Sequence, residues 1–113
     1  MLYLTIIHNG SNTCLQNYTG NLDIANNTND ADILFRSDDG SGGTTAYFYL
    51  DGSQTVTRFP QAIRFEDNIK ANFGAGNDLQ IYHTGTHSYI HNDTGDLNIE
   101  NDATDGNIDF CSD

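Results

Sequence analysis

The chain contains about one and a half copies of a repeating unit, in which position 79 corresponds to position 4. Residues 4–38 align with residues 79–113 without a gap, and 15 of the 35 aligned positions are identical. Self-similarity at a fixed period is typical of repeat proteins, in which one unit cannot bury its apolar side chains alone and packs against its neighbours. We therefore expect residues 1–113 to form a single repeat-built segment with no separate second core.

The matched apolar residues alternate with polar ones. The stretches Leu79–His83, Leu97–Ile99 and Ile108–Phe110 carry them at every second position, which is the period of a β-strand with one buried face. Turn residues such as Asp93-Thr94-Gly95 lie between these stretches. The predicted inward, structural core positions are Leu4, Ile6, His8, Leu22, Ile24, Ile33, Phe35, Leu79, Ile81, His83, Leu97, Ile99, Ile108 and Phe110.

The stretch between the two copies continues in the same manner. Strands are expected over Thr44–Leu50, Val56–Phe59, Ala62–Phe65 and Ile69–Phe73, separated by turns rich in Gly, Asp and Ser. An apolar period of 3.6 residues with helix caps is missing from the sequence. Short strands without helical crossovers predict an all-β, elongated fold.

The chain has few apolar residues with which to stabilise such strands. Leu, Ile, Val and Phe make up only 25 of the 113 residues, close to the level below which strongly charged chains do not fold alone. Association of copies would supply the missing apolar contacts. We expect a homotrimeric β-prism or β-helix, with a monomeric β-solenoid as the alternative and a small sandwich as a third arrangement.

The charge balance limits the partners. With 16 acidic and 4 basic residues, the chain lacks the Lys and Arg clusters that bind nucleic acid phosphates or an anionic membrane surface. Membrane insertion is not expected either, because the sequence has no run of 18 apolar residues. Cys14 and Cys111 occupy unrelated repeat positions, so we expect free thiols and maturation in a reducing compartment such as a cytoplasm.

Metal sites and catalytic residues are not predicted. His8 and His83 share one register and could form rings of three in a trimer, but structural packing is the favoured interpretation. His83, His87 and His91 would align only on a helix, and this segment alternates as a strand. The Gly74–Asp78 turn resembles one calcium nonapeptide, which functions in consecutive copies. Without a nucleophile elbow, phosphate loop or zinc signature, the chain is predicted to be no enzyme and to use no cofactor.

The second copy resembles a known kind of repeat. Gly76–His83 (GNDLQIYH), Ser88–Asn92 and Thr94–Leu97 are similar to the GNDLQIYHDGSNSYI…TGDL repeats of virion proteins of marine bacteriophages, especially tail-fibre-like ones. Ser37–Gly43 and Tyr47–Gly52 resemble the partner stretch of that repeat. The resemblance implies a homotrimeric shaft segment of a viral tail fibre, made in the host cytoplasm and located in the virion, with a role in host attachment.

Two other functions stay open on the sequence alone. Outward tyrosines such as Tyr82 could stack on a sugar ring and make the chain a host-glycan-binding fibre module, although cross-strand aromatic packing is favoured. A calcium-stabilised extracellular repeat is the third hypothesis. The sequence departs from the phage pattern at Thr84 and His87, which weakens the expectation of a ligand-binding turn.

Overall fold

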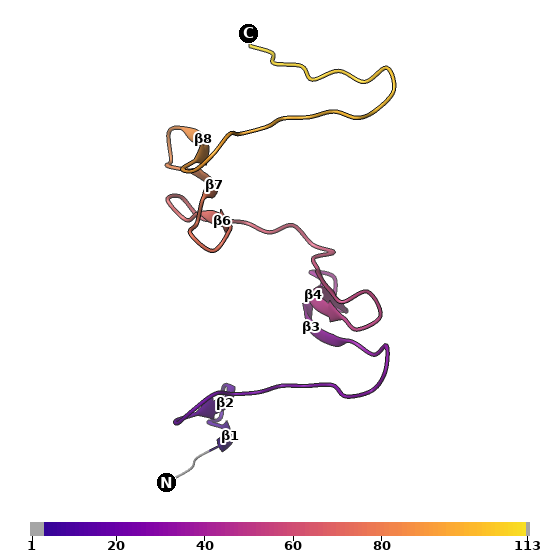
Figure 1. The fold of residues 1–113 in the computed structure, drawn as a ribbon. Helices are drawn as coiled ribbons and strands as arrows, with labels where there is room; N and C mark the ends of the chain where they lie inside the picture. The colour runs from indigo at the N-terminus through magenta and orange to yellow at the C-terminus, as the bar shows by residue number, and fades with distance from the viewer. Residues whose placement is uncertain (1–3, 113) are drawn as a thin grey trace. The chain divides into compact units, whose positions relative to one another are not determined.

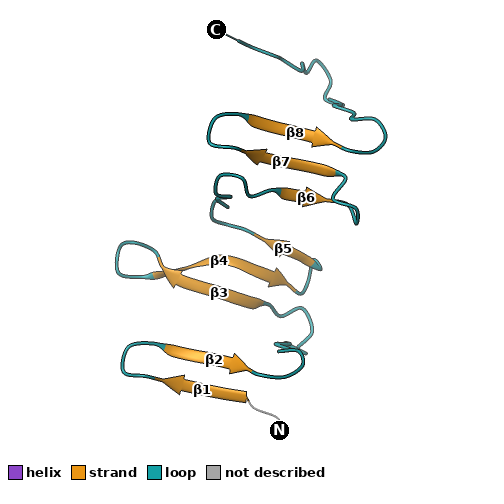
Figure 2. Cartoon of the chain, turned by 90° about the vertical axis from the view of Figure 1, so that its left-hand side faces the viewer, coloured by secondary structure: helices purple, strands orange, loops and turns teal. Residues whose placement is uncertain are grey.

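The computed structural model describes residues 4–112 and divides into two compact units, residues 1–62 and 63–113, which we describe separately. The described residues form eight β-strands in three antiparallel sheets and no helix (Figures 1 and 2). The predicted all-β class is confirmed. With no helix among residues 4–112, none of them belongs to a helix that could cross a membrane.

The first unit begins with a two-stranded hairpin. Strands β1 (Leu4–His8) and β2 (Thr13–Asn17) pair from Leu4 opposite Asn17 to His8 opposite Thr13. The Asn9 side chain closes the turn, because its Oδ1 atom accepts hydrogen bonds from the amides of the second and third residues after it, at 3.1 and 2.8 Å. Gly10 supplies the positive φ, 93°, that this turn requires.

A three-stranded sheet completes the first unit. Strands β3 (Ile33–Asp38), β4 (Thr44–Asp51) and β5 (Val56–Arg58) lie in that order, and a bulge interrupts the β3–β4 register after Phe35. The turn from β4 to β5 packs against the chain before β3, where the amide of Gly52 donates to Asp32 Oδ1 at 3.0 Å. The predicted strands Thr44–Leu50 and Val56–Phe59 therefore exist with shifted ends.

The second unit contains one three-stranded sheet. Strands β6 (Ala71–Phe73), β7 (Leu79–His83) and β8 (Ser88–Asn92) lie in chain order, and β6 is shorter than predicted. The β7–β8 hairpin repeats the β1–β2 hairpin one period later, with the matching strand bounds and the same register. The matched sequences thus form the same local structure twice.

An asparagine in each copy holds the turn that follows the hairpin. Asn26 Nδ2 donates to the carbonyl of Asp32 at 3.1 Å, and Asn26 Oδ1 accepts from the amide of Thr28 at 3.1 Å. Asn101 makes both bonds at the same spacings along the chain, at 2.9 and 3.0 Å. Asp30 and Asp105 take up the same positive φ in these turns, 59° and 61°.

Four stretches that the sequence predicts as inward or strand-forming are not strands. Leu22–Ile24, Ala62–Phe65, Leu97–Ile99 and Ile108–Phe110 carry no strand assignment. The alternation of apolar residues is present in them, but a strand also needs a neighbour for its backbone groups. No described residue fills that role, and this corrects the expectation for these four stretches.

Candidate functional site

The described chain has no buried core. None of its described side chains, apolar or polar, is buried, and many large apolar side chains are exposed. Monomeric soluble proteins rarely expose contiguous apolar patches larger than a few hundred Å². The faces on which these apolar side chains gather are therefore the candidate functional surfaces.

One such face covers the β3–β4–β5 sheet, and we call it the phenylalanine face. Ile33 lies opposite Leu50 and Phe35 lies opposite Phe48, so these four side chains share one side of the sheet. The Phe35 and Phe48 rings stack with centroids 4.4 Å apart and planes 9° apart, and Phe59 stacks on Phe48 at 5.9 Å. The result is a three-ring ladder, flanked by two aliphatic side chains, that remains open to solvent.

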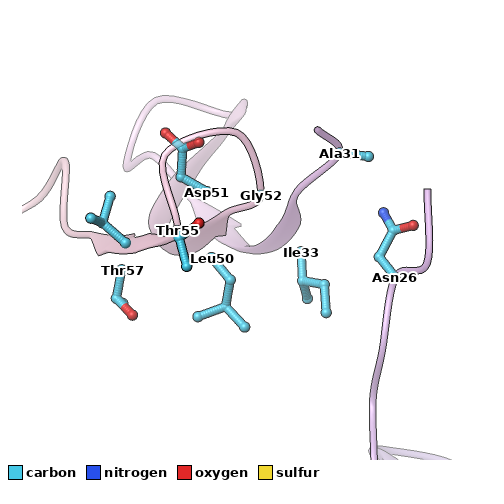
Figure 3. Close-up of a pocket in the computed structure, with 9 residues that line it drawn as sticks. Asn26, Ala31, Ile33, Leu50, Asp51, Gly52, Thr55 and Thr57 are labelled. Atoms are coloured by element: carbon cyan, nitrogen blue, oxygen red, sulfur yellow. The ribbon is translucent and has the colours of Figure 1, made fainter. Parts of the chain in front are cut away.

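A hollow of about 360 Å³ lies where the turn before β3 approaches β4 and β5. Figure 3 shows Ile33 and Leu50 pointing to one side of the sheet, whereas the Asp51 carboxylate points to the other. Asp51 is the acidic group that lines the hollow, and its Oδ2 atom is paired with Arg58 Nε at 2.8 Å. The hollow thus offers apolar side chains and a carboxylate that is already engaged in an ion pair.

Two aspartates in this unit accept hydrogen bonds from their own turns. Asp39 Oδ1 accepts from the Ser41 hydroxyl and amide, both at 2.8 Å, and from the Gly43 amide at 3.0 Å. The Ser41 hydroxyl, followed by these amides, lowers the pKa of Asp39 below its ordinary value. The Ser53 hydroxyl, at 2.8 Å, is the main cause of the lowered pKa of Asp51. Both carboxylates therefore act as turn-closing acceptors.

A second apolar face covers the β6–β7–β8 sheet, and we call it the isoleucine face. Ile81 lies opposite both Ile90 and Ala71, and Leu79 lies opposite Phe73, so all five residues share one side. Part of this face lines a shallow groove of about 730 Å³. Three of the side chains, those of Phe73, Ile81 and Ile90, are exposed.

The opposite side of that sheet is aromatic and polar. The Tyr82 and Tyr89 rings stack across the strand pair with centroids 5.0 Å apart, and Lys70 Nζ lies 4.8 Å from the centroid of the Tyr82 ring. Lys70 also donates to Gln80 Oε1 at 2.6 Å. Tyr82 thus packs across the strands, as favoured from the sequence, and Tyr89 and Lys70 both lie against its ring.

Acidic and histidine side chains continue the polar side. Gln80 Nε2 donates to Asp93 Oδ2 at 3.1 Å, and Asp93 Oδ1 lies 2.6 Å from His91 Nε2. In this connected set His91 and Asp93 are exposed and Gln80 is half-buried, and the set ties the end of β8 to β7. It stabilises the hairpin by local hydrogen bonds.

The two matched histidines are held by hydroxyl groups. His8 Nδ1 lies 3.2 Å from Thr13 Oγ1, and His83 Nδ1 lies 3.0 Å from Ser88 Oγ. Each pair sits directly across its hairpin at the same register. Among the described residues, no cluster of three or more His, Cys, Asp or Glu side chains could hold a metal ion.

The Gly74–Asp78 turn, considered above for calcium, is closed by its own residues. The Asn77 amide donates to the Gly74 carbonyl at 3.1 Å. The Asp78 carboxylate occupies the space beside Gly74 and Gly76, where a Cβ atom would come within 2.7 and 2.8 Å of it. Its Oδ1 atom accepts from the Thr94 hydroxyl at 3.2 Å. The glycines make room for this carboxylate.

The predicted core positions divide into two groups. Those on strands are Ile6 and His8 on β1, Ile33 and Phe35 on β3, and Leu79, Ile81 and His83 on β7, with Leu4 also on β1 although its side chain lies outside the described part. Those in strand-free segments are Leu22, Ile24, Leu97, Ile99, Ile108 and Phe110. Whether these residues form a core stays a prediction about the assembled protein.

Several residues of the two apolar faces were not predicted from the sequence. They lie outside the matched positions of the repeat: Phe48, Leu50, Phe59, Phe73 and Ile90. The alternation of Ala46, Phe48 and Leu50 was the available signal for β4.

Comparisons with protein family models, with curated proteins and with solved structures give no match to this chain.

Proposed function

We propose that the chain is a structural segment of a viral, bacteriophage-type tail fibre. It assembles as a parallel homotrimer in which the three copies cover one another's apolar faces. The observation that carries this proposal is the pair of open faces, phenylalanine and isoleucine, on sheets whose described side chains are nowhere buried.

The energetics favour association over a lone chain. Fully burying a large apolar side chain contributes about 1.5–3 kcal/mol, and fixing each backbone residue costs about 1–2 kcal/mol. Within either unit the exposed apolar side chains leave about half of that contribution unused. Copies that meet on these faces would recover it. A monomeric solenoid would have to cover the same faces with further coils of its own chain.

The repeat supports a fibre in particular. Two hairpins with matching bounds and register recur one period apart, and a fixed period suits a long object built from equal steps. The resemblance of Gly76–His83 and Ser88–Asn92 to virion repeats of marine phages points the same way. The role is mechanical: the segment separates a receptor-binding tip from the particle, in the virion, without a catalytic step.

Light scattering coupled to gel filtration tests the proposal. The expected mass is three times 12.4 kDa. Ile81→Asp, which puts a charge on the isoleucine face, is expected to give the monomer mass, because burying an unpaired carboxylate is costly. Asn72→Asp is the matched control, since Asn72 is exposed on the opposite side of the same sheet. A clean monomer for the unaltered chain, or equal effects of both variants, would overturn the proposal.

A further inference from the structure

We propose that residues 21–25 and 96–100, which are not strands in the single chain, become strands when a neighbouring copy of the chain supplies their hydrogen-bonding partner. The partner is the free edge of β2 for the first segment and of β8 for the second. This inference rests on the proposed self-association and specifies how the copies are joined.

The two segments have the pattern of a strand and lack a partner. Leu22 and Ile24 alternate with polar or small residues, as do Leu97 and Ile99 in the second copy. Neither segment has a backbone hydrogen bond to another described residue. The side chains are 47% and 55% exposed in the first copy and 46% and 55% in the second. The same open conformation is therefore built twice.

Hydrogen bonds hold each segment at both ends. Upstream, Asn17 Nδ2 donates to the Gly20 carbonyl at 3.2 Å, and Asn92 donates to the Gly95 carbonyl at 3.0 Å. Downstream, the Asn26 and Asn101 turns described above fix the exit. In Figure 1 the chain leaves β2, and likewise β8, as a drawn-out segment between these two turns. A segment already fixed at its ends loses less conformational entropy when it binds a partner.

The acceptor edge follows from the sheet orders. If residues 21–25 and 96–100 pair in the same way, their partner must be a strand that occurs in both copies of the repeat. Only the strands of the two hairpins do so among the described strands. β7 lies between β6 and β8, so neither of its edges is free. The remaining edge, present in both copies, is the outer edge of β2 and of β8.

These edges are also chemically open. β2 (TCLQN) and β8 (SYIHN) carry no Lys, Arg or Pro, the residues that commonly block an edge strand. By contrast β3 contains Arg36 and β5 contains Arg58. Each acceptor strand is five residues long, like each donor segment. Pairing would extend the sheet by one strand and bring Leu22 and Ile24, or Leu97 and Ile99, onto its surface.

Amide hydrogen exchange of the assembled full chain tests this arrangement. Amides in residues 21–25 and 96–100 that point to the partner edge are expected to exchange at least about a hundredfold more slowly than the amide of Gly42, which lies in an exposed loop. A trimer with this protection supports both proposals. A trimer whose two segments exchange as fast as the loop overturns the inference and leaves the fibre proposal standing. A monomer overturns both.

A cysteine scan gives an independent measurement. Cys14 on β2 is free, and in a Cys111→Ser background each of residues 21–25 is replaced in turn by Cys and oxidised. Pairing predicts an intermolecular disulfide chiefly at the one position that lies directly opposite Cys14, because the neighbours two residues away on the same face are about 7–8 Å distant, beyond disulfide reach. Ser41→Cys, in an exposed loop, is the control and should stay uncrosslinked. Equal crosslinking at all five positions, or none at any of them, would overturn the inference.

Discussion

Residues 33–38 and residues 108–112 carry the same Ile-x-Phe-x-Ser pattern, yet only the first set is a β-strand. Phe35 is 41% exposed because β4 lies beside β3 and Phe48 stacks on its ring, whereas Phe110 is 84% exposed. No described strand lies beside residues 108–112. The repeat therefore encodes the potential to form a strand, and a neighbouring strand realises it.

The two hairpins differ in a second way. Their apolar side is maintained, with Ile6 and Leu15 in the first copy where the second has Ile81 and Ile90. Ile6 is 74% exposed and Ile81 is 45% exposed, since β6 lies beside β7 and no described strand takes that place beside β1. The other side changes completely, from Ile7 and Cys14 to the stacked tyrosines. If copies of the chain associate through the apolar side, the residues of that side must be kept in each repeat, whereas those of the other side can change.

Truncating the matched phenylalanines should show the largest effect. Phe35→Ala removes the contact with Phe48 and is expected to lower the free energy of unfolding by about 1–3 kcal/mol, less than for a fully buried ring. Phe110→Ala is expected to cost less than about 0.5 kcal/mol, as for a surface substitution. Urea unfolding at fixed protein concentration measures both. Equal losses would contradict this expected difference and would show that another copy covers residues 108–112.

Glycine substitutions test the close approach of the β4–β5 turn to the chain before β3. A Cβ atom at Gly52 would lie 2.2 Å from the Ala31 carbonyl oxygen, so Gly52→Ala is expected to lower the unfolding free energy by about 1–3 kcal/mol. Gly106→Ala is the comparison variant: a Cβ atom there would lie 2.7 Å from Asn101 Nδ2, the end of a side chain that can shift, and the equivalent residue of the first copy is already Ala31. Thermal unfolding followed by circular dichroism should separate the two variants. A tolerated Gly52→Ala would show that the β4–β5 turn does not depend on this approach.

The asparagine turns should respond equally in the two copies. Asn26→Ala and Asn101→Ala each remove two hydrogen bonds between side chain and backbone, and each is expected to cost about 0.5–1.5 kcal/mol. The measurement is again the unfolding midpoint, with the additivity of the double variant as a check. A clear difference between the copies would show that the strand after Asn26 contributes to holding its turn.

Acid should weaken the loop that joins β3 to β4, with the smallest effect of the series. The pKa of Asp39 is lower in the folded chain than its ordinary value of 3.8, so the unfolded chain binds the proton first. The stability that Asp39 contributes is complete above that value and is lost as the pH falls through it toward the folded pKa. In a pH titration of the melting temperature, Asp39→Asn should flatten the acid limb. Asp23→Asn, which installs the residue found at Asn98, should not.

Much of the strand order could be predicted from the sequence, and the reason is local. Alternation placed β1 and β7 through the repeat, and Gly and Asp clusters delimited β4 and β5. The register bulge after Phe35 and the stacking of Phe59 on Phe48 could not be predicted, because both depend on contacts between strands. For the same reason, alternation around Leu97 and Ile108 predicted strands where no described strand lies beside these residues.

The matched turns also bear on how such a chain could grow. In each copy, the glycine turn after the hairpin and the asparagine turn that follows it are held by hydrogen bonds between residues of the same repeat. Tandem duplication of one full period would add a unit in which these turns already have their bonds, whereas an odd number of residues inserted into a strand would reverse the alternation beyond it. The length of such a chain could therefore change in steps of one whole repeating unit.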